Sequence, residues 1–355
     1  LVHAAGLCDA SDLTLAHPSI RDGHGTISVT ADIRNDRAGL SARGAISIRS
    51  GGYRAMRLHD LTGRFEVKDD VLLLRAVSGG IARGGFDLDA DIQLREANPA
   101  PNRVRVATRG VPVVEAGRLL DLPLLILENP ADASVSVTWH HGDEDLKVDG
   151  SARLHGEASS QARPGDRTPL DGTVDFTYRG TGDVLVRAAN LVSAHSSLRA
   201  ADNGDGSFRV GLTTRRIAEP MRLIANFSGP VLDILAKKPD LFSLAGTFGF
   251  DGDARIRSES DVALRGVVAV RDGRWRNLSI ARATARADFQ PPFLRLRELQ
   301  AQSGARSLAG EIDLELAGSE HIAGVAFRGN ARGIPLASLE DFGLDPAGAE
   351  GTAGG

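Results

Sequence analysis

The chain has 355 residues, of which 42% are hydrophobic and 5% aromatic, and its 42 basic and 46 acidic residues give a formal net charge of −4 at pH 7. Because the two signs are mixed along the chain, there is no basic stripe of the kind that nucleic acid requires, so no nucleic-acid partner is expected. The single cysteine, Cys8, excludes an internal disulfide framework and any cysteine-based zinc or iron–sulfur site.

No segment approaches the roughly 20 consecutive apolar residues that a membrane-spanning helix needs. The longest candidate, residues 119–127, is interrupted by Asp121 and Pro123. The chain begins at Leu1 rather than at a methionine and ends in the glycine-rich residues 351–355. We therefore expect it to be a piece of a longer polypeptide.

Strict alternation of apolar and polar residues recurs from the start of the chain to its end. The clearest case is residues 86–95, where apolar side chains would point to one face of a strand and polar side chains to the other. The same period of two occurs at residues 26–33, 45–49, 134–139, 173–178, 264–270 and 311–316. This pattern is typical of antiparallel sheet with one apolar and one solvated face.

Short turn signals separate these segments. Asn-Gly and Asp-Gly pairs, which favour the positive φ angles of tight hairpins, occur at Asp22-Gly23, Asn203-Gly204, Asp251-Gly252 and Asp272-Gly273. Lys68-Asp69-Asp70 and His141-Gly142-Asp143 give two further turn signals, and the polar residues 158–169 form the one extended loop. The sequence therefore predicts a long meander in which most strands pair with their sequence neighbours.

Three strand-like runs end in related Gly/Pro turns, at residues 109–112, 228–230 and 332–335. The turns lie about a hundred residues apart, which suits one supersecondary module rather than a short solenoid rung. Apolar residues with helical spacing follow each turn, at residues 113–120, 231–235 and 336–339. Proline near the first position suits the start of a short helix, although an apolar loop is the alternative.

These turns divide the chain into four parts. Residues 1–112 form a first β-repeat module, residues 113–229 a short helix and a second module, residues 230–333 a short helix and a third module, and residues 334–355 the start of a further repeat. A second repeat relates residues 61–94 to residues 283–316, because strand, turn, Leu/Arg-rich strand, Ser/Gly turn and acidic alternating strand follow in the same order.

The two copies at residues 61–94 and 283–316, together with residues 332–339, resemble the AsmA-like superfamily of bacterial envelope proteins, which includes the TamB-type proteins. The resemblance covers nearly the whole chain and depends on pattern and repeat order rather than on an invariant motif. It implies an all-β fold, a long twisted antiparallel β-meander curled into a β-taco-like groove, with short helical turns between repeats. It also implies a periplasmic location and an inner-membrane anchor outside this chain.

The partners that the resemblance implies are phospholipid acyl chains and, through the rest of the parent chain, an outer-membrane β-barrel. Members of the family are thought to guide phospholipid, or to assist outer-membrane protein assembly, without enzymatic chemistry or a cofactor. Each acyl methylene exposed to water costs about 0.8 kcal/mol, so an apolar strip would shield a lipid that crosses an aqueous gap. The candidate groove residues are the apolar members of the alternating segments: Phe86, Leu88, Ile92, Leu94, Val135, Val137, Val174, Phe176, Val268, Val270, Ile312, Leu314 and Leu316.

Two other functions remain open. If the apolar face is closed off as a core, the chain is an extracellular β-repeat scaffold of the adhesin or passenger type. A β-helical carbohydrate-active enzyme is a third interpretation, but it needs paired carboxylates and stacked aromatic residues, and this chain has few aromatic residues.

No constellation predicts catalysis or metal binding. Residues 140–145 (His-His-Gly-Asp-Glu-Asp) gather metal-ligand side chains, but adjacent histidines on a strand point to opposite faces and acidic hairpins are ordinarily solvated. Residues 202–206 lack the spacing of a calcium loop. We expect Cys8 to be a small buried apolar side chain, and Trp139 and Trp275 to lie in a core or at a groove lip.

Overall fold

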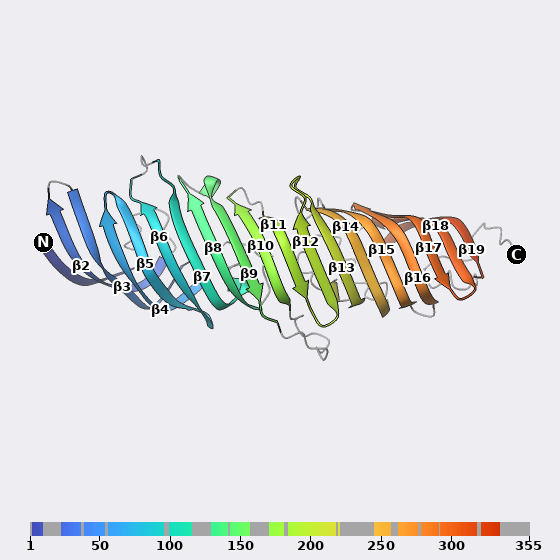
Figure 1. Cartoon of the computed structure of the whole chain (residues 1–355), viewed down its shortest axis with the longest axis horizontal. Coiled ribbons are helices and arrows are strands. Elements are labelled where there is room, and N and C mark those ends of the chain that lie inside the picture. The colour runs from blue at the N-terminus through green and yellow to red at the C-terminus, as the bar shows by residue number, and fades with distance from the viewer. Residues whose placement is uncertain are drawn as a thin grey trace. The chain divides into compact units, whose positions relative to one another are not determined.

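In the structure, a computed structural model, the described residues form nineteen strands. Every pairing between these strands is antiparallel and joins strands that follow one another in the sequence (Figure 1). No described pairing closes the meander into a barrel. The predicted all-β, antiparallel meander is therefore confirmed. The residues that the structure describes are 2–9, 23–36, 39–53, 56–95, 99–115, 129–140, 143–156, 170–180, 184–217, 219–220, 245–256, 262–275, 278–290, 292–317 and 321–333.

The chain divides into two compact units, one made of residues 1–157 and 169–187 and the other of residues 158–168 and 188–355. Unit 1 contains β1 (Val2–Asp9), β2 (Gly23–Asp36), β3 (Gly39–Tyr53), β4 (Met56–Lys68), β5 (Val71–Ile81), β6 (Gly84–Gln93), β7 (Asn102–Pro112), β8 (Pro130–Trp139), the 3-10 turn η3 (Asp143–Asp145), β9 (Lys147–Leu154) and β10 (Asp171–Arg179).

The division falls within β11 (Val184–Val192). Unit 2 continues with β12 (Ser196–Asp202), β13 (Phe208–Arg216), β14 (Ala245–Ile256), β15 (Val262–Trp275), β16 (Leu278–Gln290), β17 (Phe293–Ser303), β18 (Arg306–Ala317) and β19 (His321–Arg332). The predicted module boundary after residue 112 lies inside unit 1, where β7 ends.

The strand register in unit 1 places apolar side chains on one face of the sheet. Residues that directly oppose each other across a pair of strands share a face, so a row of opposed residues can be followed from strand to strand. One such row crosses β5 to β10 through Val77, Leu88, Val106, Val135, Gly150 and Phe176. The alternation in the sequence thus becomes a continuous apolar surface.

Unit 2 has the same arrangement. One row crosses β12 to β16 through Leu198, Leu212, Phe250, Val268 and Ala285. A second row crosses β16 to β19 through Phe289, Leu294, Leu314 and Val325. Each unit therefore has an apolar face and an opposite face that carries mainly polar side chains.

The predicted repeat of residues 61–94 and 283–316 is confirmed by a β-bulge that occurs in both copies. In β5 the pairing skips from Leu74 to Val77, and in β17 it skips from Leu296 to Leu299. In each copy, the residue just before the point where pairing resumes is in the left-handed region. Ala76, before Val77, has a φ of 50°, and Glu298, before Leu299, has a φ of 53°.

Each bulge also carries the same ion pair. Arg75 lies 2.5 Å from Asp91, and Arg297 lies 2.7 Å from Asp313. The Arg75 guanidinium also donates to the carbonyls of Leu74 and Ala90. A bulge interrupts the ladder of backbone hydrogen bonds, so an arginine that caps the carbonyls beside it stabilises the interruption.

Two of the predicted turns are wrong. Asp251-Gly252 lies inside β14, where Gly252 opposes Gly266 and a Cβ on Gly252 would lie 2.5 Å from the Gly266 Cα. The glycine there permits a close approach of two strands rather than a turn. Asp272-Gly273 lies inside β15, and Asp272 takes a φ of 50° while the strand continues to Trp275.

Other turn predictions are confirmed. Asp69 and Asp70, both at positive φ, join β4 to β5, and Gly204 at φ 83° lies in the turn between β12 and β13. The first predicted helical segment begins directly after Pro112, since residues 113–115 are helical. The segments at 231–235 and 336–339 and the loop at 158–169 lie outside the described residues.

Candidate functional site

The apolar face of unit 1 is densely packed at one end of the strands. The buried side chains there belong to β4–β7 and form one hydrophobic cluster: Met56, Leu61, Val77, Ile81, Phe86 and Val111. They lie near the start of β4, the end of β5, the start of β6 and the end of β7, which meet at the same end of the meander.

Bulges and left-handed residues accompany this cluster. Asp60, Ala76 and Gly110 have φ values of 50°, 50° and 63°, and register shifts interrupt the β4–β5, β5–β6 and β7–β8 pairings near them. A bulge bends its strand and increases the local twist. The bends let side chains of one face of the sheet pack against one another at this end.

Away from the cluster, much of the same face stays only half-buried. Val104, Val135, Val137 and Val174 are neither sealed from water nor fully exposed. The buried exceptions include Val148 and Leu154 on β9, which are 2% and 3% exposed. In a closed sandwich, residues at the centre of both inner faces would be buried like these two. The face is therefore partly open in unit 1.

The candidate groove residues differ in their exposure. Phe86 is buried in the cluster, and Leu94, which follows β6, is 40% exposed. Leu316 lies on β18 opposite Ile322, but its side chain is not among the described ones. The remaining candidates are half-buried: Leu88, Ile92, Val135, Val137, Val174, Phe176, Val268, Val270, Ile312 and Leu314. The register brings the candidates together on one face within each unit.

Three phenylalanines of unit 1 lie over glycines of the neighbouring strand. Phe65, Phe86 and Phe176 directly oppose Gly44, Gly79 and Gly150, respectively. A Cβ on each glycine would approach a ring atom within 2.9, 3.0 and 2.5 Å. The rings therefore lie down on the sheet and cover exposed backbone, as aromatic residues do beside strand glycines. The sequence reading did not include Phe65, and a glycine at an apolar position of the adjacent strand is the signal that identifies it.

Unit 2 has a thinner apolar lining. Its buried side chains are mostly small, with Ala254, Ala285 and Ala287 between 3% and 8% exposed. Val268, Val270 and Leu314 around them are half-buried, and Phe327 on β19 is 40% exposed. Because the buried side chains are small, the larger apolar side chains around them keep part of their surface accessible to water.

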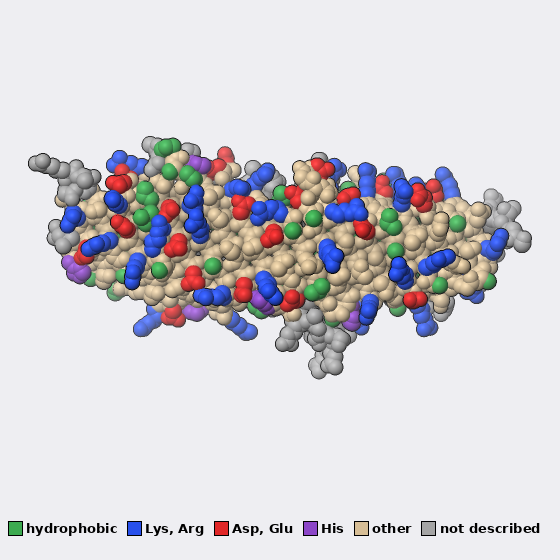
Figure 2. Space-filling model, viewed as in Figure 1, with side chains coloured by type: hydrophobic (Ala, Val, Ile, Leu, Met, Phe, Trp, Pro, Cys, Tyr) green, Lys and Arg blue, Asp and Glu red, His purple; other side chains and the backbone are tan. Residues whose placement is uncertain are grey.

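The opposite face carries charged and hydroxyl side chains. Arg109 donates to Asp87 at 2.6 Å, and Lys147 lies 2.8 Å from Asp149. The hydrogen bond from Lys147, followed by that from Thr177, lowers the pKa of Asp149 below its usual value. Figure 2 shows basic and acidic side chains interspersed over the surface in view, with few hydrophobic ones between them. Pairs of this kind suit a face that stays in water.

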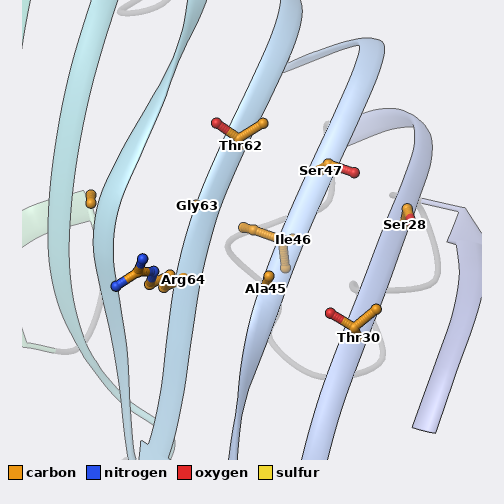
Figure 3. A pocket seen from close by; sticks show the side chains of 9 residues that line it. Ser28, Thr30, Ala45, Ile46, Ser47, Thr62, Gly63 and Arg64 are labelled. Carbon is orange, nitrogen blue, oxygen red and sulfur yellow. The ribbon is translucent and has the colours of Figure 1, made fainter.

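One hollow of about 510 Å³ lies on the polar face of β2–β5 (Figure 3). Its polar lining comes from Ser28 and Thr30 on β2, Ser47 on β3, and Thr62 and Arg64 on β4. Among the described lining residues there is no imidazole or carboxylate beside these hydroxyls. The hollow therefore contains no nucleophile paired with a general base.

A buried polar cluster in unit 2 was not anticipated from the sequence. Thr214 is fully buried, and the Ser196 hydroxyl lies 2.8 Å from the Thr214 hydroxyl and also hydrogen-bonds to Glu219. Ser193 donates to the same Glu219 oxygen at 2.7 Å. The hydroxyls satisfy a carboxylate that is 7% exposed, and the cluster connects β12 and β13 to the residues after β13.

The sequence candidates for metal binding form no site in the described part of the chain. His140 contacts Asp145 at 3.1 Å across the turn before β9, and no group of metal-binding side chains is found among the described residues. The 202–206 segment is a hairpin turn in which Asp202 accepts from the Gly204 N–H. Trp139 is half-buried at the end of β8. Cys8 on β1 lies opposite Ile27 of β2 and is partly exposed.

No protein-family model matches this chain, and searches of the curated proteins and of the solved structures find no match either. Among the described residues there is no helix with the length and hydropathy to cross a bilayer.

Proposed function

We propose that the apolar face of each unit binds phospholipid acyl chains, and that this chain is a non-catalytic segment of an AsmA/TamB-like, periplasm-spanning envelope protein. The observation that supports this proposal is the set of continuous apolar rows in which members outside the packed cluster stay half-buried, as in Val104, Val135 and Val137. An exposed apolar strip of this length is unfavourable in water unless a ligand or partner covers it. In the proposed setting, the parent chain supplies the inner-membrane anchor and contacts an outer-membrane β-barrel.

The binding energy of an acyl chain on this face suits a protein that guides lipid along its surface better than one that stores it. Strands are spaced about 4.8 Å apart, so successive members of an apolar row repeat at that interval from strand to strand. An acyl chain that buries the equivalent of five methylenes on these rows gains about 4 kcal/mol. Because neighbouring members of a row are similar apolar side chains, moving from one strand to the next changes that energy little, and the lipid meets no deep minimum on its way.

A closed-core scaffold of the adhesin type is the second candidate. The packed cluster of Met56, Leu61, Val77, Ile81, Phe86 and Val111 favours it, since these side chains are sealed from water by the fold itself. The two functions differ in what the half-buried remainder of the face contacts. In a guide the remainder contacts lipid, whereas in a scaffold it contacts only protein.

The deciding variant is Leu314→Asp on the apolar face of β18. Leu314 is half-buried between Leu294 and Val325, so the new carboxylate can keep part of its hydration while it obstructs the path of an acyl chain. The matched control is Val267→Asp, which adds the same charge at a residue of the polar face that is 47% exposed.

Transfer of a fluorescent phospholipid between vesicles and the melting temperature are measured on both variants. We expect Leu314→Asp to abolish transfer with a nearly unchanged melting temperature, and Val267→Asp to change neither. Loss of more than about 4 kcal/mol of unfolding free energy in Leu314→Asp would mark a closed core. Full transfer by a folded Leu314→Asp protein would also refute the guide.

A further inference from the structure

Arginines gather at one end of the strands of unit 2. β13, β15, β17 and β19 end there, and β14, β16 and β18 begin there. Within five residues of this end, Asp272 is the only carboxylate on the described parts of these strands. We name six of the arginines at this end the arginine rim: Arg216, Arg271, Arg274, Arg282, Arg306 and Arg332.

Rim arginines lie close together without carboxylate partners. Arg271 and Arg282 directly oppose each other on β15 and β16, and Ala245 lies between Arg216 and Arg274 in one row. The Arg282 guanidinium donates to the Gln302 side-chain carbonyl at 2.7 and 3.1 Å. No rim arginine forms an ion pair with a carboxylate of the described residues.

Arginines nearer the other end of the same strands are compensated. Arg265 lies 3.3 Å from Asp288, and Arg297 lies 2.7 Å from Asp313. Opposed like charges destabilise a pair of strands, so the uncompensated Arg271–Arg282 pair has a cost that the compensated end avoids. An anionic ligand would remove that cost.

The arginine rim adjoins the apolar face. Val270 and Ala283 directly oppose each other on the apolar face, and their sequence neighbours Arg271 and Arg282 occupy the opposite face near the same end of the strands. Arg306 begins β18 two residues before Leu308, so it occupies a position of the apolar face at its border. Positive charge therefore gathers at the strand ends that border the apolar face, where the headgroup of a lipid bound on that face would lie.

We propose that the arginine rim binds the headgroup phosphates of phospholipids whose acyl chains lie on the apolar face of unit 2. This inference rests on the proposed function and specifies its lipid class. Guanidinium groups bind phosphate through paired, charge-assisted hydrogen bonds. Because Asp272 is the one carboxylate within five residues of this end on the described strands, and Glu219 is buried among hydroxyls, a headgroup amine would meet mainly arginine. The rim therefore selects anionic phospholipids over zwitterionic ones.

The test uses the whole chain and two triple variants with equal changes in net charge. The rim variant carries Arg271→Gln, Arg274→Gln and Arg282→Gln. The control variant carries Arg209→Gln, Arg265→Gln and Arg295→Gln, at the other end of the same strands. Fluorescent phosphatidylglycerol and phosphatidylcholine are offered in detergent-free form, and the dissociation constant of each lipid is measured at low and at high salt.

We expect the unmodified chain to bind phosphatidylglycerol more tightly than phosphatidylcholine, and the preference to weaken at high salt. One arginine near an anionic lipid surface changes affinity about fivefold, so the rim variant loses roughly a hundredfold in phosphatidylglycerol affinity. Its phosphatidylcholine affinity and melting temperature stay close to those of the unmodified chain. The control variant keeps the preference, because two of its arginines, Arg209 and Arg265, are paired with carboxylates and all three lie at the other end of the strands.

Three results would overturn the proposal that the arginine rim binds lipid phosphates. One is an unchanged preference in the rim variant, and another is an equal loss in the control variant, which would assign the effect to net charge. The third is binding of a single-stranded RNA oligonucleotide that falls by the same factor in the rim variant, which would assign the arginines to nucleic acid. Failure of the unmodified chain to bind either lipid would instead reject the proposed function, and the rim with it.

Discussion

Two phenylalanines on the apolar face of unit 1 give the sharpest test of its packed and open regions. Phe86 and Phe65 each lie over a glycine of the adjacent strand, but Phe86 is 6% exposed within the cluster while Phe65 is half-buried outside it. Substituting each by alanine removes the same ring from two environments. The difference between the two variants therefore measures how completely the fold, rather than water or ligand, surrounds each ring.

The expected magnitudes follow from burial. Phe→Ala at a fully buried site costs about 3 to 5 kcal/mol, because the transfer energy is lost and a cavity remains. Phe65 keeps part of its surface in contact with water, so less transfer energy is lost and we expect a cost of about 1 kcal/mol. In a unit of this size each kcal/mol lowers the melting temperature by about 2–4 °C. Phe86→Ala should thus lower it by about 10 °C and Phe65→Ala by about 3 °C.

Circular dichroism on heating measures the two melting temperatures, and hydrogen exchange with mass spectrometry assigns the loss of protection to β3–β7. Addition of phospholipid should raise the melting temperature of the unmodified chain and of Phe86→Ala by similar amounts, and that of Phe65→Ala by less. Equal destabilisation by the two substitutions would refute the distinction between a packed end and an open remainder.

Two further predictions concern single contacts in unit 1. Gly150→Ala should destabilise the unit by about 1–3 kcal/mol, since its Cβ would lie 2.5 Å from the Phe176 ring, whereas Gly211→Ala in unit 2, with no atom within 4 Å of the new Cβ, should be neutral or slightly stabilising in the same denaturant titration. Asp149 has a lowered pKa in the folded state, so its stabilisation is present above the unfolded value of about 4 and is lost as the pH falls through the folded value. The gap in unfolding free energy between the unmodified chain and Asp149→Asn should therefore be widest at neutral pH and narrow below pH about 4, and a gap independent of pH would contradict this.

The strands could be predicted because alternation reports a one-sided sheet directly. The segment at 86–95 becomes β6, and its apolar residues share a face with those of β5 and β7. The residues at which strands end are harder to predict from the sequence. Leu94 continues the alternation, but β6 ends at Gln93, so Leu94 is exposed. The period of two carries no signal that a strand has ended.

Bulges and close approaches could not be predicted from residue type. Ala76 and Glu298 occupy equivalent bulge positions at positive φ, although neither residue favours that region. Conversely, the Asp-Gly pair at residues 251–252 predicts a turn where there is none, because Gly252 lies inside a strand and permits its close contact with Gly266. A glycine that a turn requires and a glycine that a neighbouring strand requires look the same in one sequence.

The arginine rim depends on register for the same reason. Along the chain, Arg271 and Arg282 stand among residues of both signs, and composition describes the charges as mixed. The hairpin between β15 and β16 places these two residues opposite each other. Segregation of charge between the two ends of a strand is visible only once each strand has a direction and a partner.

The repeated bulge explains how a one-sided sheet can be stable while part of its apolar face remains accessible. In each copy the arginine ion pair secures the bulge, and the residue after the bulge, Val77 or Leu299, is buried at 3% or 8% exposure. Stability then comes from the backbone ladder and from a buried side chain at each bulge, which around Val77 belongs to a larger cluster, rather than from a second layer over the whole face. Rows away from the bulges do not have to be sealed for the unit to fold. Those rows are the ones that a lipid could occupy, and in unit 2 they border the arginine rim.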